Sequence, residues 1–261
     1  MQGSLLAGEE DPVVVLNGEA ASPFLLVCEH AGRKIPKSLG NLGLEASDLE
    51  AHIAWDIGAE AVSRGLAERL RAPLVLQRYS RLVYDCNRPP EAPDAIPAVS
   101  EVTPIPGNAG LTAAAREERT RAIYRPFHAK IAELIERRLA KGILPTLVTI
   151  HSFTPVYKGR RRIVELGLLH DTDSRLADAM LAAVGRQENP VTRRNEPYGP
   201  EDGVTHTLKI HALPRGLLNV MIEIRNDLVR IEREQASWVE RLANLLTEAL
   251  ATFRGRTAAR A

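Results

Sequence analysis

Residues 24–32 read FLLVCEHAG, an apolar run that ends in an acid, a histidine and a turn. Five consecutive apolar residues, 24–28, are typical of a buried strand in a parallel sheet. Glu29 and His30 place polar groups at the C-terminal end of that strand, and Ala31-Gly32 favour a turn. In open α/β sheets, ligands bind at this end of the strands.

A second stretch, residues 146–152, reads TLVTIHS and ends in the same way at His151. If the two strands are parallel neighbours, His30 and His151 lie at one edge of the sheet, where two imidazoles can hold a divalent metal. The alternative for each histidine alone is an ordinary hydrogen-bonded residue at a strand end. Because both histidines have the same context, we favour the metal site.

The rest of the chain alternates between strand and helix patterns. Apolar residues at helical spacing predict helices, and short apolar runs predict further strands. The predicted helices cover residues 59–70, 112–141, 174–184 and 238–253, and the predicted strands cover residues 74–76, 82–84, 163–169, 207–211 and 217–225. This order predicts an α/β fold, a three-layer α/β/α sandwich around a mixed, mostly parallel central sheet.

Two segments have no regular pattern. Residues 1–22 are predicted to form a lead-in segment or a short edge element, and residues 91–112 a long loop. No linker rich in proline, serine or glycine divides the chain, so we expect residues 1–261 to form a single domain.

The composition argues against several kinds of partner. The 261 residues include 34 basic and 33 acidic side chains, for a net charge of +1, and 44% are hydrophobic. This balance gives no reason to expect a nucleic acid or a membrane, so a small-molecule substrate is favoured. No apolar run approaches the ~18 residues of a membrane span. Two cysteines without a CxxC motif, and no signal-peptide pattern, favour a cytoplasmic location.

Glu223 stands in the apolar run LLNVMIEIR, residues 217–225. An acid between Ile222 and Ile224 must be paired with a cation or have a raised pKa. One interpretation is a salt bridge to Arg225 or another arginine. The other is a general base.

Other polar residues also have two interpretations. Arg88 beside Asn87 offers parallel donors suited to a carboxylate, or it holds a helix or loop carbonyl. Asp56 either ligates the metal or caps the helix that follows it. The basic run from Arg160 to Arg162 is interpreted as a solvated loop.

Six segments in order, CEHAG, WDIGAE, YSRLVYDCNR, TIHSF, NEPYG and MIEIRNDL, resemble the N-formylglutamate amidohydrolase family, one of the zinc-carboxypeptidase-like hydrolases. The resemblance covers residues 24–230. That family usually has Ser-Gly after its first histidine, an Asp-Leu-Asn-Arg box and a His-Ser-Met triplet. Here residues 30–32 read HAG, residues 85–88 read DCNR and residues 151–153 read HSF.

The resemblance implies a sandwich of the zinc-carboxypeptidase/phosphorylase-hydrolase type and a role for each matching residue. His30 and His151 match two ligands of Zn²⁺ or another divalent metal. Asn87 and Arg88 match the pair that holds the substrate carboxylate, and Glu223 matches the catalytic glutamate.

The third metal ligand is not implied as directly. Zinc carboxypeptidases use a glutamate three residues after the first histidine, where this chain has Arg33. Asp56 is our first choice for the third ligand, and Glu29 is the second.

The implied activity is that of a metal-dependent amidohydrolase. Its substrate would be an N-acyl amino acid such as N-formyl-L-glutamate, and its products a short carboxylic acid and a free amino acid. Glu223 would take a proton from the attacking water, and Arg81 or His206 would support the oxyanion. The alternatives are a carboxypeptidase-type metallopeptidase and a non-catalytic module that binds acidic small molecules.

Overall fold

The computed structural model describes residues 5–185 and 190–258 and has a seven-stranded sheet at its centre. In the order β1-β3-β2-β6-β11-β9-β10, the strands are β1 (Val13–Leu16), β3 (Leu74–Gln77), β2 (Phe24–Cys28), β6 (Thr146–Phe153), β11 (Asn219–Arg225), β9 (Leu166–Leu169) and β10 (Thr192–Arg194). Strands β3, β2, β6 and β11 are parallel, as are β9 and β10. Strand β1 is antiparallel to β3, and β9 is antiparallel to β11. The predicted mixed, mostly parallel sheet is confirmed.

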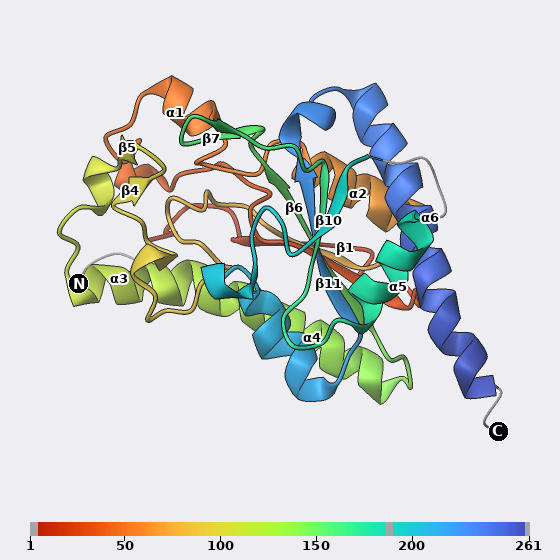
Figure 1. The fold of residues 1–261 in the computed structure, drawn as a ribbon. Coiled ribbons are helices and arrows are strands. Elements are labelled where there is room, and N and C mark those ends of the chain that lie inside the picture. The colour runs from red at the N-terminus through yellow and green to blue at the C-terminus, as the bar shows by residue number, and fades with distance from the viewer. Residues whose placement is uncertain (1–4, 186–189, 259–261) are drawn as a thin grey trace.

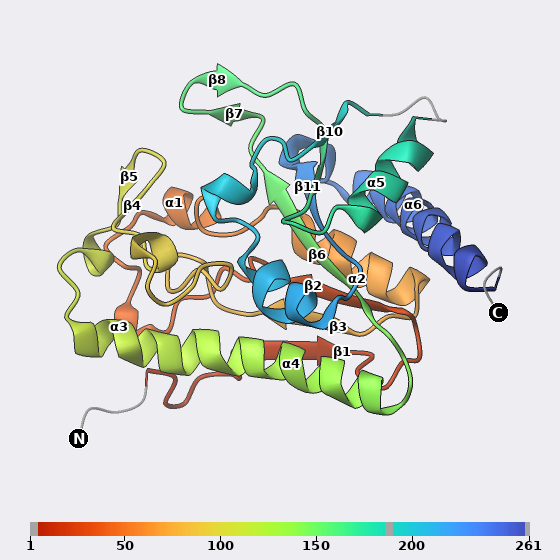
Figure 2. The ribbon, with the colours of Figure 1, turned by 60° about the horizontal axis from the view of Figure 1, so that its bottom comes forward.

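Helices cover both faces of this sheet (Figures 1 and 2). They are α1 (Ala46–Glu50), α2 (Ala59–Arg69), α3 (Ala113–Arg119), α4 (Arg125–Ala140), α5 (Arg175–Val184) and α6 (Glu232–Ala258). Short 3₁₀ turns cover Lys37–Leu39, Pro93–Ala95, Pro106–Asn108, Pro200–Asp202, Leu213–Arg215 and Asn226–Leu228. Helices α2, α5 and α6 pack on one face around Leu66, Met180 and Leu242, and α4 packs on the other around Phe127 and Ile131. The three predicted layers are therefore present.

All five residues of β2 are buried. Leu26 and Cys28 belong to the core under α2, whereas Leu25 and Val27 belong to the core under α4. Successive side chains of a strand point to opposite faces, so a strand covered on both faces needs a continuous apolar run. The sequence FLLVC therefore fixes β2 in the middle of the sandwich.

The same alternation places polar side chains on the α4 face. Leu147 of β6 and Met221 of β11 belong to the core under α4. His151 follows Leu147 by four residues and Glu223 follows Met221 by two, so both lie on that face. In the parallel pairing of the two strands, Glu223 is opposite His151.

The helix predicted over residues 112–141 is divided into α3 and α4. A π-helical segment, Thr120–Tyr124, lies between them, just before Pro126. Because proline has no N–H to donate, the regular bonding pattern of an α-helix cannot continue through it. Gly142, with a φ of 72°, follows the end of α4, where the sequence predicts a stop.

The predicted strand at residues 82–84 is wrong, because this segment forms turns. Val83 N donates to Ser80 O, and Leu82 N donates to Ser80 Oγ. A serine that bonds nearby N–H groups favours a turn over a strand. Leu82, Val83 and Tyr84 are all fully buried, so their apolar character reflects a packed loop.

The predicted strand at residues 207–211 is also wrong. Leu208–Ala212 is a π-helical segment in which Leu208, His211 and Ala212 are buried. Their spacing of three and four residues is helical, not alternating. The strand predicted at residues 163–169 begins only at Leu166, since Ile163 is exposed.

Two hairpins lie outside the main sheet. The loop over residues 91–112 contains β4 (Val99–Ser100) and β5 (Thr103–Pro104), and β7 (Val156–Tyr157) and β8 (Arg160–Arg161) follow β6. Figure 2 shows both hairpins at the upper side of the molecule, β7 and β8 beyond the arrowhead of β6. Within residues 1–22, β1 is the short edge element that the sequence predicts.

Cys28 and Cys86 are buried, and neither forms a disulfide. Within the described ranges, no helix combines the length and apolar character needed to cross a bilayer.

Gly167 of β9 marks a close approach beside the site. It pairs with Glu223, and a Cβ atom at position 167 would lie 2.1 Å from the carbonyl oxygen of Glu196 and 3.1 Å from Cβ of Glu223. Only glycine therefore lets the segment before Tyr198 lie against this part of the sheet.

We predict that Gly167→Ala lowers the free energy of unfolding by about 1–3 kcal/mol, the usual cost of forcing an extra group into a packed site. Urea denaturation measures the change. Gly185→Ala is the matched control, because its Cβ would meet nothing closer than 3.7 Å and its φ is −60°. Equal stability of the Gly167→Ala variant and the parent would contradict the close approach.

Candidate active site

The C-terminal ends of β2, β6 and β11 border a cavity of about 510 Å³. His30, Asp56, Arg81, His151 and Glu223 all contribute to its lining. Parallel strands thus bring together residues from distant parts of the chain, at the edge of the sheet where ligands are expected.

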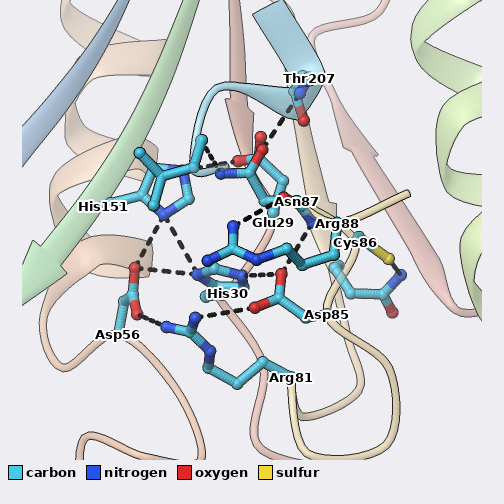
Figure 3. A network of polar contacts seen from close by, with 12 residues as sticks. Glu29, His30, Asp56, Arg81, Asp85, Cys86, Asn87, Arg88, His151 and Thr207 are labelled. Atoms are coloured by element: carbon cyan, nitrogen blue, oxygen red, sulfur yellow. Dashed lines mark hydrogen bonds and ion pairs between the residues drawn. The ribbon is translucent and has the colours of Figure 1, made fainter. Parts of the chain in front are cut away.

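His30, Asp56 and His151 form a compact buried cluster (Figure 3). His30 Nδ1 lies 3.2 Å from His151 Nδ1 and 3.3 Å from Asp56 Oδ2, and His151 Nδ1 lies 3.0 Å from the same oxygen. In a tetrahedral zinc site with bonds of ~2.0–2.1 Å, the ligand atoms lie ~3.3 Å from one another. The cluster could therefore hold a metal ion without rearrangement.

Both imidazoles turn their other nitrogen towards a carboxylate. His30 Nε2 lies 2.7 Å from Asp85 Oδ1 and is hydrogen-bonded to it. His151 Nε2 lies 3.1 Å from Glu29 Oε2, which is an ion-pair distance without hydrogen-bond alignment. A carboxylate beside Nε2 favours a proton there and leaves the Nδ1 lone pair for a metal. Two lone pairs and a carboxylate oxygen then face one another, an arrangement that a cation satisfies.

The buried charges favour a divalent cation. Burial alone would raise the pKa of Asp56, Asp85 and Glu29, but the neighbouring imidazoles hold each pKa below its usual value, helped by the Arg81 guanidinium at Asp56 and Asp85. Burial alone would lower the pKa of Arg81, but two carboxylates raise it. With neutral imidazoles, three carboxylates and one guanidinium leave two negative charges uncompensated. One divalent cation balances them.

The same negative charge acts on the two histidines. Burial opposes protonation of both imidazoles, but the carboxylates beside them outweigh it. The pKa of His30 is raised, and that of His151 is raised well above its usual value. Protons and a metal ion therefore compete for this cluster.

The alternative role of Asp56 as a helix cap is contradicted. The N-cap of α2 is Gly58, and no side chain caps this helix. Asp56 N donates to His30 O at 2.9 Å, and Ser152 N donates to Asp56 Oδ2 at 3.2 Å. The backbone at the ends of β2 and β6 thus holds the Asp56 carboxylate beside both imidazoles.

Two charged residues close to His30 in the sequence, Glu29 and Arg33, lie outside the cluster of ligand atoms. Glu29, our second choice for the third ligand, contacts the far nitrogen of His151, and its carboxylate lies outside the cluster of ligand atoms. Arg33 stacks over Trp55 at 5.2 Å.

Asp85 is a site residue that the sequence interpretation missed. It accepts hydrogen bonds from Arg81 Nη2 at 2.8 Å and from Asn87 N at 2.9 Å, in addition to its contact with His30. Arg81 Nη1 also donates to Asp56 at 3.2 Å, so this arginine joins the two acids. The sequence signal is an acid four residues after Arg81 and two before Asn87.

Glu223 is buried and lines the cavity beside His151. The expected salt bridge to Arg225 is contradicted, because Arg225 pairs with Glu165 and Asp227. In the part of the chain that the structure describes, no arginine forms an ion pair with Glu223, and its Oε2 has no hydrogen-bond partner. Burial raises the pKa of Glu223 to about 7. This value suits a general base at neutral pH.

Asn87 lies in the cavity lining, but its amide also has a structural role. Its Nδ2 donates to Val204 O, and its Oδ1 accepts a hydrogen bond from Thr207 N at 3.1 Å. Asn87 therefore fixes the segment that enters the π-helical turn at Leu208.

Arg88 also lines the cavity and has the structural role that was one of its two interpretations. Its Nη1 donates to Asn87 O and Gly203 O, each at 3.0 Å, so it does hold loop carbonyls. Its Nε donates to Asp94 Oδ2 at 2.7 Å, and the Asp94 side chain is 56% exposed. A substrate carboxylate would meet a guanidinium already fixed in orientation.

His206, the second predicted oxyanion donor, lies apart from this group. Its Nε2 is 2.8 Å from Tyr124 Oη, and it does not contribute to the cavity lining among the described residues. Burial lowers its pKa to about 4, so the imidazole is neutral at pH 7.

Both hairpins contribute residues to the lining of the cavity, Ser100 and Glu101 from β4–β5 and Tyr157 from β7–β8. Glu101, at the turn of β4–β5, has Oε2 2.8 Å from His52 Nε2 and accepts a hydrogen bond from Lys158 N at 2.8 Å. One carboxylate thus links both hairpins and the segment after α1.

Arg162 is a further lining residue, and the interpretation of this position as solvated loop is wrong. Its guanidinium lies over the rings of Tyr157 and Tyr198, at 4.5 and 4.7 Å. Its Nη1 donates to Tyr198 Oη at 2.9 Å. The tyrosines of VYKGR and NEPYG were the available signal, because aromatic rings beside a basic run can hold a guanidinium.

Comparison with known proteins agrees with this architecture. The crystal structure of a gene product from Agrobacterium tumefaciens is 57% identical, with a TM-score of 0.93, over 95% of this chain and 98% of that one. The structure of N-formylglutamate amidohydrolase from Ralstonia eutropha is 20% identical, with a TM-score of 0.68, over 94% of this chain and 100% of that one. The second likeness shows the fold. No match is found among curated proteins.

A family model for N-formylglutamate amidohydrolase matches residues 22–230. This range is most of the chain and includes every residue of the buried cluster, from Glu29 to Glu223. The chain belongs to the N-formylglutamate amidohydrolase family of hydrolases.

Proposed function

We propose that the protein is a metal-dependent amidohydrolase that cleaves the N-acyl amide bond of an N-acyl amino acid such as N-formyl-L-glutamate. The products are a short carboxylic acid, such as formate, and a free amino acid. One observation carries this proposal: the His30–Asp56–His151 cluster and the unpaired carboxylate of Glu223 share one small cavity.

His30, Asp56 and His151 are the residues that would hold Zn²⁺ or another divalent metal. Three protein ligands are typical of a catalytic zinc site. When bound, such an ion acts as a Lewis acid that polarises the acyl carbonyl and makes water more acidic. Asp85 and Glu29 position the imidazoles of His30 and His151 through their Nε2 atoms, on the side away from the metal cluster.

Glu223 is the proposed general base. Its carboxylate, in the cavity lining, would take a proton from the attacking water and later return it to the leaving amine. A pKa of about 7 allows both steps near neutral pH. Glu223 carries no other ion pair among the described residues, so its carboxylate is free to accept that proton.

Arg81 and Arg88 have different proposed roles. Arg81 lines the cavity and is the donor assigned to the oxyanion, whereas the position of His206 does not favour it for this role. Arg88 is assigned to the α-carboxylate of the substrate, and Asn87 orients the neighbouring segment.

The size of the cavity favours a small substrate over a peptide. A volume of about 510 Å³ is at the small end of ligand pockets. Glu101, which lines this cavity, also contacts His52 and Lys158 N, so the two hairpins cannot move apart without breaking these contacts. A non-catalytic binder has no need for an unpaired buried acid such as Glu223, because burying it costs stability.

We predict that the purified protein binds about one Zn²⁺ per chain and that His151→Ala abolishes this binding, because the variant loses one of three ligands. Elemental analysis after gel filtration measures the stoichiometry, and circular dichroism checks folding. His170→Ala is the control, since His170 contacts Asp171 and Arg194 outside the cluster. Full zinc occupancy in a folded His151→Ala protein would remove His151 from the ligand set.

We predict that zinc binding releases protons near pH 7. The nearby carboxylates raise the pKa of His30 and of His151, so the metal-free imidazoles hold their protons to a higher pH than ordinary histidines, and each must lose its proton to ligate. Zinc affinity should therefore fall as the pH falls below these raised values, by up to about tenfold per pH unit for each proton released. Calorimetric titration in buffers of different ionisation enthalpy counts the protons. A zinc affinity that stays constant between pH 6 and pH 8 would be incompatible with this cluster as the site.

We predict that Glu223→Gln lowers kcat by roughly 10²–10⁴-fold while zinc content and substrate binding change little, because a general base acts mainly in the transition state. Turnover of N-formyl-L-glutamate, bound zinc and Tm should be measured on one preparation. Glu165→Gln, which removes a partner of Arg225 outside the cavity, is the control and should retain kcat. A stable, zinc-loaded Glu223→Gln protein with undiminished turnover would refute the mechanism.

A further inference from the structure

Arg162 differs from the other two arginines that line the cavity. Arg81 forms ion pairs with Asp56 and Asp85, and Arg88 forms one with Asp94. No carboxylate in residues 5–185 and 190–258 forms an ion pair with Arg162. Its guanidinium brings a positive charge to the cavity that the described side chains leave uncompensated.

The guanidinium of Arg162 is nevertheless held in place. Tyr157 and Tyr198 lie against it at 4.5 and 4.7 Å, Phe153 lies at 5.6 Å, and its Nη1 donates to Tyr198 Oη. Its backbone N donates to Pro155 O at 2.8 Å, which fixes the base of the side chain. Nη1 also donates to Thr154 O at 3.5 Å, whereas Nε and Nη2 donate to no described group, so these N–H groups remain available for a planar anion.

Arg162 shares its cavity with the proposed catalytic residues. Arg162, Tyr198 and Glu223 line one cavity, and Arg88 lines it too. Consider a substrate whose α-carboxylate binds Arg88 and whose amide bond lies at Glu223. Its side chain then extends within a cavity that still contains the unpaired guanidinium of Arg162.

We propose that Arg162 is a specificity-determining residue that binds a second anionic group, a side-chain carboxylate, on the substrate. The inference rests on the proposed amidohydrolase function and adds the residue that selects a substrate with a second carboxylate. Tyr157 and Tyr198 act as positioning residues that hold the guanidinium in the cavity lining.

The test compares N-formyl-L-glutamate with its neutral analogue N-formyl-L-glutamine, using the zinc-loaded protein. The parent should prefer the glutamate derivative in kcat/KM by about 10- to 100-fold, the worth of a charge-assisted contact. Arg162→Gln should lose most of this preference, mainly through a higher KM, and keep its kcat/KM for the glutamine derivative. Arg160→Gln, an exposed position on the same hairpin, is the matched control and should behave as the parent.

Tm and zinc content show whether a variant is folded. If Arg162→Gln does not fold, Arg162→Lys is measured instead. Lysine keeps the positive charge but loses the planar fork of the guanidinium. Its preference for the glutamate derivative over the glutamine derivative should be weaker than that of the parent but not abolished. A parent that hydrolyses both derivatives equally well would overturn the role of Arg162 and leave the amidohydrolase activity standing. Equal losses on both derivatives in a folded Arg162→Gln protein would also overturn it.

Binding of the free amino acids separates this inference from the proposed function. The parent should bind L-glutamate more tightly than L-glutamine, and Arg162→Gln should bind both equally. If the parent hydrolyses neither derivative, the proposed function fails. The difference in affinity between L-glutamate and L-glutamine still decides whether Arg162 binds the second carboxylate. Equal binding of the two amino acids by the parent would reject that role.

Discussion

The site depends on the electrostatic balance between three buried carboxylates and the cationic groups around them. Asp56, Asp85 and Glu29 are each less than a tenth exposed, and burying that much like charge is very costly unless it is compensated. Arg81 supplies one positive charge, and the two imidazoles or a bound cation must supply the others. This requirement explains why the acids, the histidines and the arginine occur as one connected network (Figure 3).

The parallel strands make this network possible. Strands β2, β6 and β11 are neighbours, so their last residues meet at one edge although they are far apart in sequence. The strands are covered by helices on both faces and are mostly apolar, although β6 contains Thr146 and Thr149 and β11 begins with Asn219. The ionisable side chains lie only at the C-terminal ends of these strands, where residues from the loops beyond the sheet can reach them.

The parts of the fold that follow from continuous burial could be predicted from the sequence. The runs at residues 24–28 and 146–152 are strands because both of their faces are covered, and the polar residues that end them converge for the same reason. Leu82 to Tyr84 shows the limit of this reasoning, because full burial in a packed loop gives the same apolar signal as a strand.

The positions of Asp85 and Arg162 could not be derived from periodicity. Asp85 reaches His30 through a turn that Ser80 and Asn87 stabilise, and Arg162 reaches the cavity only because a hairpin folds back over it. Both contacts are tertiary. The family resemblance implied roles for Asn87 and Arg88 but none for Asp85, which begins the same DCNR box, and none for Arg162, which lies outside the motifs.

The sheet order has a consequence for synthesis of the chain. Strand β11 is the last strand in the sequence, but it lies between β6 and β9 and joins the group β1-β3-β2-β6 to the pair β9-β10. Until residues 219–225 have left the ribosome, β6 is paired with β2 on one edge only, and its other edge has no partner. The earlier part of the chain therefore cannot complete the sheet before β11 emerges, and a chain that ends before residue 219 presents one free edge of β6 to chaperones and proteases.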